Sequence, residues 1–206
     1  MVTEHTDDDV LINEQLDLRA AKPVRTDLEL TVFRYLVQRF STESAELLND
    51  TVDAVCEVTG ADSAGITLLD RQPDGTDILR WVATAGRITE LPLQALPRTF
   101  SPCGTVLDRG EPQLFSYPGR FFTCIPDSWD IVELLLVPWR IGDSGQGILW
   151  ALMQCDARKF DREDLWTLQN LVVFASAAVA RSEAETAALK QAPHWLPGSP
   201  ASLPTP

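Results

Sequence analysis

The sequence predicts an α+β fold: a central antiparallel sheet with N- and C-terminal helices packed on one face and an irregular, pocket-forming segment on the other. Two observations predict this layout, namely two separate β-hairpin patterns and the helical patterns that flank them. A third is the stretch between the hairpins, residues 86–132, which is rich in proline, glycine and aromatic residues. Hairpins joined in this order favour one antiparallel layer covered by helices.

Two helical patterns precede the first hairpin. Apolar residues recur at helical spacing over residues 28–40 and again over residues 45–58, where Gly60 provides a stop signal. Residues 1–26 are polar and acidic, so we expect a flexible leader with room for one short helix at 9–21.

The hairpins follow from alternating patterns and turn residues. Residues 63–70 and 78–85 flank a Pro-Asp-Gly turn at 73–75, which favours chain reversal. Residues 134–141 and 147–154 form a second pair of strand patterns, separated by a glycine-rich turn.

The segment between the hairpins has little regular pattern. We predict a loop, a short helix at 104–109, a short strand at 113–115 and a loosely helical stretch through Trp129. Long irregular segments inside a compact domain are usually lids or walls of ligand sites. This segment is therefore the predicted pocket wall.

A long helix is predicted over residues 162–191, with Asp161 as N-cap and Asp164 at the capping-box position. Small residues recur along one side of it, which favours a homodimer built from this helix and the first one. Residues 192–206 are proline-rich and predict a disordered tail. The compact domain then spans 27–191.

Composition argues against several functions. Seventeen Lys and Arg stand against 30 Asp and Glu, a formal net charge of −13, which disfavours binding to nucleic acids or anionic membranes. The chain has no apolar run long enough to span a membrane and an acidic N-terminus unlike a signal peptide, so we expect a cytoplasmic location. His5 and His194 are the two histidines and lie outside the predicted domain, which disfavours His-based catalysis and His-ligated metal or haem.

Several motifs carry a family resemblance. The end of the helix before the first hairpin and the first strand read CEVTGADSAGITLLD, and the hairpin partner reads ILRWVATAG. The second strand pair is ELLLVPWRIGDSGQGILWALMQ, and the start of the last helix with its capping acid is KFDREDLWTLQNLVVFASAAVA. In order and spacing these motifs resemble the GAF family. The stretch RTFSPCGTVLDRGEPQLF is similar to sensor GAF domains found ahead of bacterial histidine-kinase transmitters.

The resemblance implies a sensor or regulatory domain that binds a small molecule between the sheet and the irregular segment. It also implies a homodimer through the N- and C-terminal helices, and a histidine kinase or other signalling protein as partner. The identity of the ligand is left open, with a small flat organic molecule and a tetrapyrrole as the candidates. Bilin-binding relatives usually pair the attachment cysteine with an adjacent histidine, whereas Gly104 follows Cys103 here, so bilin attachment is disfavoured.

Two other functions stay open at this point. One is a small cysteine-dependent redox enzyme on the same fold, for which Cys103 and Cys124 are the catalytic candidates. The other is an interaction module whose pocket is filled by its own side chains. No metal site is expected, because the four cysteines lack metal-binding spacing.

Cys103 is the most informative candidate. It follows Ser-Pro directly before the predicted short helix, where the helix N-terminus would stabilise a thiolate. The alternative is a small apolar residue packed under the helix start. Cys124 lies in the same segment and is expected to face the same pocket. Cys56 and Cys155 are more typical of core or surface positions.

The remaining candidates are aromatic or charged. Tryptophans on the strands and aromatic residues in the segment suit a flat, partly apolar ligand, with ordinary core packing as the alternative. Asp130 and Glu133 would orient a polar ligand group or cap the helix-to-strand junction. Arg98 and Arg120 would bind an anionic group or remain solvated. The predicted ligand contacts are Trp81, Arg98, Phe100, Cys103, Phe121, Cys124, Trp129, Asp130, Glu133 and Trp150.

Overall fold

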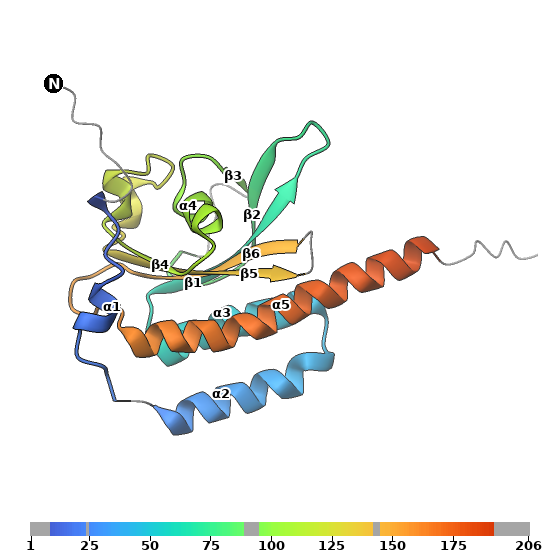
Figure 1. Ribbon diagram of the computed structural model, residues 1–206. Coiled ribbons are helices and arrows are strands. Elements are labelled where there is room, and N and C mark those ends of the chain that lie inside the picture. Colours follow the sequence, from blue (N-terminus) through green and yellow to red (C-terminus); the bar gives the residue numbers. More distant parts are fainter. Residues whose placement is uncertain (1–8, 24, 89–94, 142–144, 192–206) are drawn as a thin grey trace, which may run out of the picture.

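The computed structural model describes residues 9–23, 25–88, 95–141 and 145–191. A six-stranded antiparallel sheet lies between α3 and α5 on one face and α4 with the irregular segment on the other, and α2 forms an outer layer beyond α3 and α5 (Figure 1). The predicted α+β layout is confirmed. The helices are α1 (Gln15–Leu18), α2 (Thr26–Gln38), α3 (Ser44–Thr59), α4 (Pro102–Arg109) and α5 (Arg162–Gln191), with 3₁₀ turns η2 (Arg39–Ser41), η3 (Pro118–Arg120) and η4 (Asp127–Trp129). The strands are β1 (Ser63–Arg71), β2 (Asp77–Gly86), β3 (Ala95–Pro97), β4 (Gln113–Ser116), β5 (Glu133–Ile141) and β6 (Gly145–Met153).

The sheet order is β3-β2-β1-β6-β5-β4, so the two predicted hairpins, β1–β2 and β5–β6, lie side by side at its centre. The first hairpin turns where Gly75 adopts a positive φ of 84°. The Asp74 side chain accepts a hydrogen bond of 2.9 Å from the backbone N–H of Thr76. Asp74 and Gly75 therefore stabilise the turn that the sequence predicted, through a side-chain hydrogen bond and a positive φ angle.

Side-chain alternation along the strands divides the core into two layers. On β5, Leu135 and Val137 belong to the cluster that packs against the helices, whereas Leu134 and Leu136 belong to the cluster beneath the irregular segment. We call these two sides of the sheet the helix face and the cavity face. Successive residues of a strand point to opposite faces, so each face has its own set of core residues.

Two tryptophans lie over glycines of a neighbouring strand, one on each face. Trp150 of β6 pairs with Gly65 of β1, and Trp139 of β5 pairs with Gly147 of β6. A Cβ atom on Gly65 would lie 2.1 Å from Trp150 Cζ2, and one on Gly147 would lie 2.2 Å from Trp139 Cζ2. The glycines thus provide the space that each indole ring occupies.

The ends of the long helices follow their sequence signals. Gly60 adopts a left-handed conformation and ends α3. At the start of α5 the Asp161 carboxylate accepts from Asp164 N at 3.1 Å, and the Asp164 carboxylate accepts from Asp161 N at 3.1 Å. This reciprocal pair is the predicted capping box.

Residues 9–23 differ from the flexible leader that their composition favours. Val10 and Leu16 are buried, and Leu11 forms an isolated antiparallel bridge with Phe115 of β4. Because β4 is an edge strand, its free backbone groups accept this pairing. Residues 1–8 and 24 of the predicted leader, the turn at 142–144 and the tail at 192–206 lie outside the described residues.

Two further boundaries differ from the sequence prediction. Strand β3 pairs with β2 but was not expected, because three residues carry too little pattern. Helix α4 begins at Pro102 rather than at residue 104, since proline is well suited to the first turn of a helix. Cys103 therefore lies inside the first turn of α4 and not before it.

Candidate ligand-binding site

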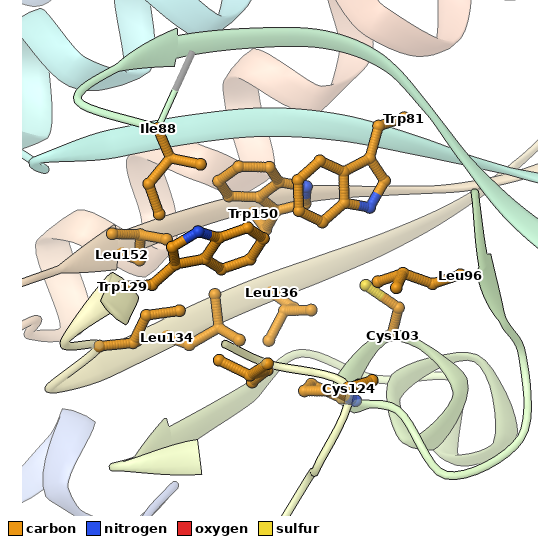
Figure 2. A pocket seen from close by; sticks show the side chains of 13 residues that line it. Trp81, Ile88, Leu96, Cys103, Cys124, Trp129, Leu134, Leu136, Trp150 and Leu152 are labelled. Atoms are coloured by element: carbon orange, nitrogen blue, oxygen red, sulfur yellow. The ribbon is translucent and has the colours of Figure 1, made fainter. Parts of the chain in front are cut away.

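A small cavity lies on the cavity face, between the sheet and the irregular segment (Figure 2). Its volume is about 40 Å³, and none of its described lining residues carries a charge. Strands β2, β5 and β6 form its floor, whereas α4, η4 and the loop residues beside η4 cover it. The lining residues are Trp81, Ile88, Leu96, Pro102, Cys103, Cys124, Ile125, Trp129, Ile131, Leu134, Leu136, Trp150 and Leu152.

Three indole rings meet at this cavity. The ring centroids of Trp81 and Trp150 are 5.4 Å apart, and those of Trp81 and Trp129 are 5.6 Å apart. Trp150 is held by a 3.1 Å hydrogen bond from its Nε1 to Thr67 Oγ1, in addition to its packing over Gly65. The structure thus brings together three predicted ligand contacts from two strands and a 3₁₀ turn.

Cys103 lines the cavity from the first turn of α4. Ser101 is the N-cap of this helix, and its side chain accepts a 3.0 Å hydrogen bond from Gly104 N. Burial raises the pKa of the Cys103 thiol to about 12, with a smaller increase from Cys124, while a hydrogen bond with Thr67 acts to lower it. The stabilised thiolate expected from the helix N-terminus is therefore absent at this residue, because desolvation outweighs the helix.

Cys124 lines the same cavity, as the sequence predicted. It is partly buried, and its thiol is placed to donate to the Phe100 carbonyl oxygen at 3.7 Å. Burial raises the pKa of this thiol as well. Both thiols are thus in their neutral form near pH 7.

Phe100 and Phe121 lie beside the cavity and do not line it. The Phe100 ring is 5.1 Å from that of Phe121 and 5.9 Å from that of Phe122. Phe100 is 55% exposed and has a positive φ of 55°, which is rare for a residue with a side chain. These rings form an aromatic cluster over the outer edge of the site.

Arg98 and Asp130 also do not line the cavity. Arg98 Nε lies 3.9 Å from Asp77 Oδ2, and its Nη2 donates to Asp108 Oδ1. Asp130 lines an adjoining open groove with Arg120, and this groove shares Ile125 and Ile131 with the cavity. Arg98 is therefore paired with carboxylates of its own chain, and Asp130 lies at the neighbouring groove.

Glu133 lies on the helix face and is 1% exposed. Arg19 donates to both of its carboxylate oxygens, at 3.0 and 2.7 Å, and Phe160 N donates to Oε2 at 3.0 Å. The structure thus places Glu133 in a buried ion pair on the side of the sheet opposite the cavity. Glu133 therefore does not line the cavity, and its partners are Arg19 and Phe160 N rather than backbone groups of the helix-to-strand junction.

Sequence reasoning missed the aliphatic part of the cavity wall. Leu134 and Leu136 alternate along β5, and Trp150 and Leu152 alternate along β6. This two-residue period would have identified them once Trp150 was assigned to the pocket. The other aliphatic residues come from loops and from the three-residue strand β3, which carry no such signal.

Two further features are absent from the described part of the chain. No group of His, Cys, Asp and Glu side chains there is arranged to hold a metal ion. None of the helices in the same ranges combines the length and apolar character needed to cross a membrane.

The family model for the GAF domain matches residues 43–179. The chain belongs to the GAF family. No curated protein matches it in sequence. The matched range contains α3, the whole sheet, the cavity and most of α5, so the described site lies within the GAF domain itself.

Solved GAF structures have the same fold at low sequence identity. The GAF domain of an Acinetobacter phosphoenolpyruvate-protein phosphotransferase is 22% identical with a TM-score of 0.61, covering 76% of this chain and 95% of its own. A free methionine-R-sulfoxide reductase from Neisseria meningitidis, solved with its substrate, is 17% identical with a TM-score of 0.59, covering 81% and 97%. The GAF domain of a putative sensor histidine kinase from Pseudomonas syringae pv. tomato is 19% identical with a TM-score of 0.54, covering 81% and 95%.

Proposed function

We propose that this GAF domain is a regulatory sensor that binds a small molecule and signals through dimer or partner contacts. The observation that carries the proposal is the apolar cavity beneath the irregular segment, where three indole rings meet. Apolar, aromatic-lined cavities are the usual form of small-molecule sites. The similarity to a GAF domain of a putative sensor histidine kinase supports the signalling part.

The sheet connects the cavity to the helices. Leu134 and Leu136 line the cavity, while Leu135 and Val137 between them pack toward the helices. A ligand that shifts β5 therefore alters the packing beneath α5. We propose this as the route from ligand to surface.

The proposed output surface is formed by α2 and α5. Val37 on α2 is 62% exposed, and Trp166 and Val173 on α5 are 51% and 59% exposed. The ring centroids of Phe33 and Phe174 are 6.0 Å apart, which holds the two helices together. Exposed apolar residues on two neighbouring helices favour a homodimer or a partner such as a histidine kinase.

A tetrapyrrole does not fit this cavity. A volume of about 40 Å³ is far below the roughly 300–1,000 Å³ of typical ligand sites. The compact domain has no histidine for haem or for a bilin site. Cys103, the attachment candidate, is buried and carries a neutral thiol. We therefore favour a smaller organic ligand.

The test of the sensor proposal is native mass spectrometry of the purified full chain, compared with denaturing mass spectrometry and an absorption spectrum. We expect a small molecule that leaves on denaturation. Light scattering then gives the mass in solution for the wild type, for Val173→Glu and for Thr76→Glu, an exposed control position on the β1–β2 turn. A dimer that Val173→Glu alone dissociates supports the output surface, and a monomeric wild type contradicts it.

A cysteine-dependent redox enzyme is the second candidate, because Cys103 and Cys124 line one cavity and a sulfoxide reductase shares the fold. Its reaction would oxidise the two thiols to a disulfide, while a sulfoxide would become a thioether and its oxygen would leave as water. The raised pKa of both thiols disfavours this chemistry. Methionine sulfoxide turnover with a Cys103–Cys124 disulfide in peptide maps would support the enzyme over the sensor.

A further inference from the structure

The charge distribution around the cavity restricts its ligand. No described lining residue is charged, and neither arginine candidate is among them: Arg98 is paired with Asp77 and Asp108, and Arg120 lines the adjoining groove. Transfer of a charged group into such a site without a compensating partner is strongly unfavourable. The described walls therefore favour an uncharged molecule.

The indole N–H groups of Trp150 and Trp81 differ in their hydrogen bonding. Trp150 Nε1 donates to Thr67 Oγ1, whereas Trp81 Nε1 is buried and has no hydrogen-bond acceptor among the described residues. In Figure 2 the nitrogen of Trp81 is on the edge of its ring that faces the Leu96 and Cys103 end of the site. A buried donor without an acceptor costs about 1–3 kcal/mol. An acceptor atom at this position would remove that cost.

The size of the cavity sets a further requirement. An apolar cavity of about 150 Å³ is known to hold benzene in another protein, so about 40 Å³ requires one wall to move for a ring-sized ligand. Trp129 is the side chain best placed to move, because it is partly buried and comes from the three-residue turn η4. Trp150 and the lining leucines of β5 and β6 lie on inner strands of the sheet instead.

We propose that the site selects a small, uncharged, mainly apolar molecule carrying one hydrogen-bond acceptor, such as a carbonyl oxygen, which binds the indole N–H of Trp81. This inference rests on the proposed sensor function and adds the chemical class of its ligand. Trp81 is then a specificity-determining residue, and the Trp129 side chain moves to enlarge the cavity when the ligand binds.

The test uses three probes of nearly equal shape on the full chain. Acetophenone carries a carbonyl acceptor, ethylbenzene has none, and benzoate is charged. Titrations followed by NMR of ¹⁵N-indole-labelled protein give an affinity for each. We expect acetophenone to bind about five- to tenfold more tightly than ethylbenzene, the factor that one net hydrogen bond contributes. We expect no binding of benzoate and a downfield shift of the Trp81 indole N–H with acetophenone only.

Two variants sharpen the test. Trp81→Phe removes the N–H and should make acetophenone and ethylbenzene bind equally. Trp139→Phe is the matched control, because Trp139 Nε1 is also buried without an acceptor among the described residues but belongs to the helix face. It should leave the preference for acetophenone unchanged. If Trp81→Phe fails to fold, the Trp81 indole N–H signal of the wild-type protein tests the inference instead. A downfield shift with acetophenone only supports it, and no such shift overturns it.

The outcomes separate this inference from the sensor proposal. Equal binding of acetophenone and ethylbenzene, or stronger binding of benzoate, overturns the inference and leaves the sensor proposal intact, because the site still takes a ligand. Failure of all probes while native mass spectrometry finds another bound molecule also overturns the inference alone. Failure of all probes together with no co-purified molecule overturns both.

Discussion

The helix face and the cavity face belong to the same six strands, yet what covers them differs. On the helix face, α3 and α5 run along the sheet, and the buried carboxylates of Glu133 and Asp164 are both paired with cations. On the cavity face, an eight-residue helix and short 3₁₀ turns leave a small cavity. Each face has one buried indole N–H without an acceptor among the described residues, Trp81 on the cavity face and Trp139 on the helix face. Long regular helices fill an extended surface continuously, whereas short turns pack it less completely. The comparison suggests that one face provides stability and the other can adapt to a ligand.

The largest expected loss of stability comes from a substitution on the helix face. Glu133→Ala removes the acceptor of Arg19 and of Phe160 N in a buried environment, so we expect the free energy of unfolding to fall by about 3 kcal/mol. Urea denaturation measures this loss. Glu185→Ala, which removes an exposed pair 3.8 Å from Arg181, should cost less than about 0.5 kcal/mol. Folded Glu133→Ala protein that had lost acetophenone binding would contradict the separation of the two faces.

The two glycine–tryptophan pairs allow the faces to be compared with one substitution. Gly65→Ala and Gly147→Ala each force a methyl group into an indole ring, so each should lower the free energy of unfolding by about 1–3 kcal/mol. Gly65→Ala should also displace Trp150 and weaken acetophenone binding, whereas Gly147→Ala should not. Calorimetric titration beside thermal denaturation checks both effects. Loss of binding in both variants would show that the cavity responds to strain on either face.

A smaller effect is expected at the start of α4. Ser101→Ala removes the side-chain acceptor for Gly104 N and should lower the free energy of unfolding by about 1 kcal/mol. It should also speed alkylation of Cys103, since the first turn of α4 then frays. Ser41→Ala is the control, because exposed Ser41 does not cap α3, whose N-cap is Glu43. Equal destabilisation by both substitutions would argue against the Ser101 cap.

The smallest effect is a dependence on alkaline pH. The pKa of Cys103 rises from 9.0 to about 12 on folding because the thiol is buried. The unfolded chain therefore releases the Cys103 proton at lower pH than the folded chain does. The protonated thiol thus contributes fully to the free energy of unfolding below pH 9, and this contribution is lost as the pH rises from 9 toward 12. Between pH 7.5 and pH 9.5 the free energy of unfolding of the wild type should fall by about 0.8 kcal/mol more than that of Cys103→Ser, as measured by urea denaturation. Identical pH profiles for the two proteins would mean that the thiol is accessible to water.

Local patterns were sufficient for most of the fold. The Pro-Asp-Gly turn, the Gly60 stop and the Asp161–Asp164 capping box all act through contacts within a few residues, so the sequence predicts them directly. The domain boundaries at 27 and 191 stay predictions, as does the cytoplasmic location. The family match covers residues 43–179 and agrees with the predicted order of elements.

The candidate site was only partly predictable. Trp81, Cys103, Cys124, Trp129 and Trp150 do line one cavity, because they lie on strands or in the irregular segment that were correctly placed. Glu133 does not, since its strand phase directs it to the helix face, where Arg19 from the N-terminal segment binds it. No local pattern connects residues 114 positions apart in the chain.

The sequence by itself determined the α+β order of elements, the acidic charge, the histidine-free domain and the two cysteines of the cavity. Tertiary structure alone decided the face on which each candidate lies and the burial that raises the pKa of Cys103. It also decided the ion pairs, which join Arg98 to Asp108 and Glu133 to Arg19. The physical reason is the separation along the chain of the residues that interact. Turns, caps and periodicity depend on near neighbours in the sequence, whereas burial and ion pairing depend on distant segments that meet only when the chain folds.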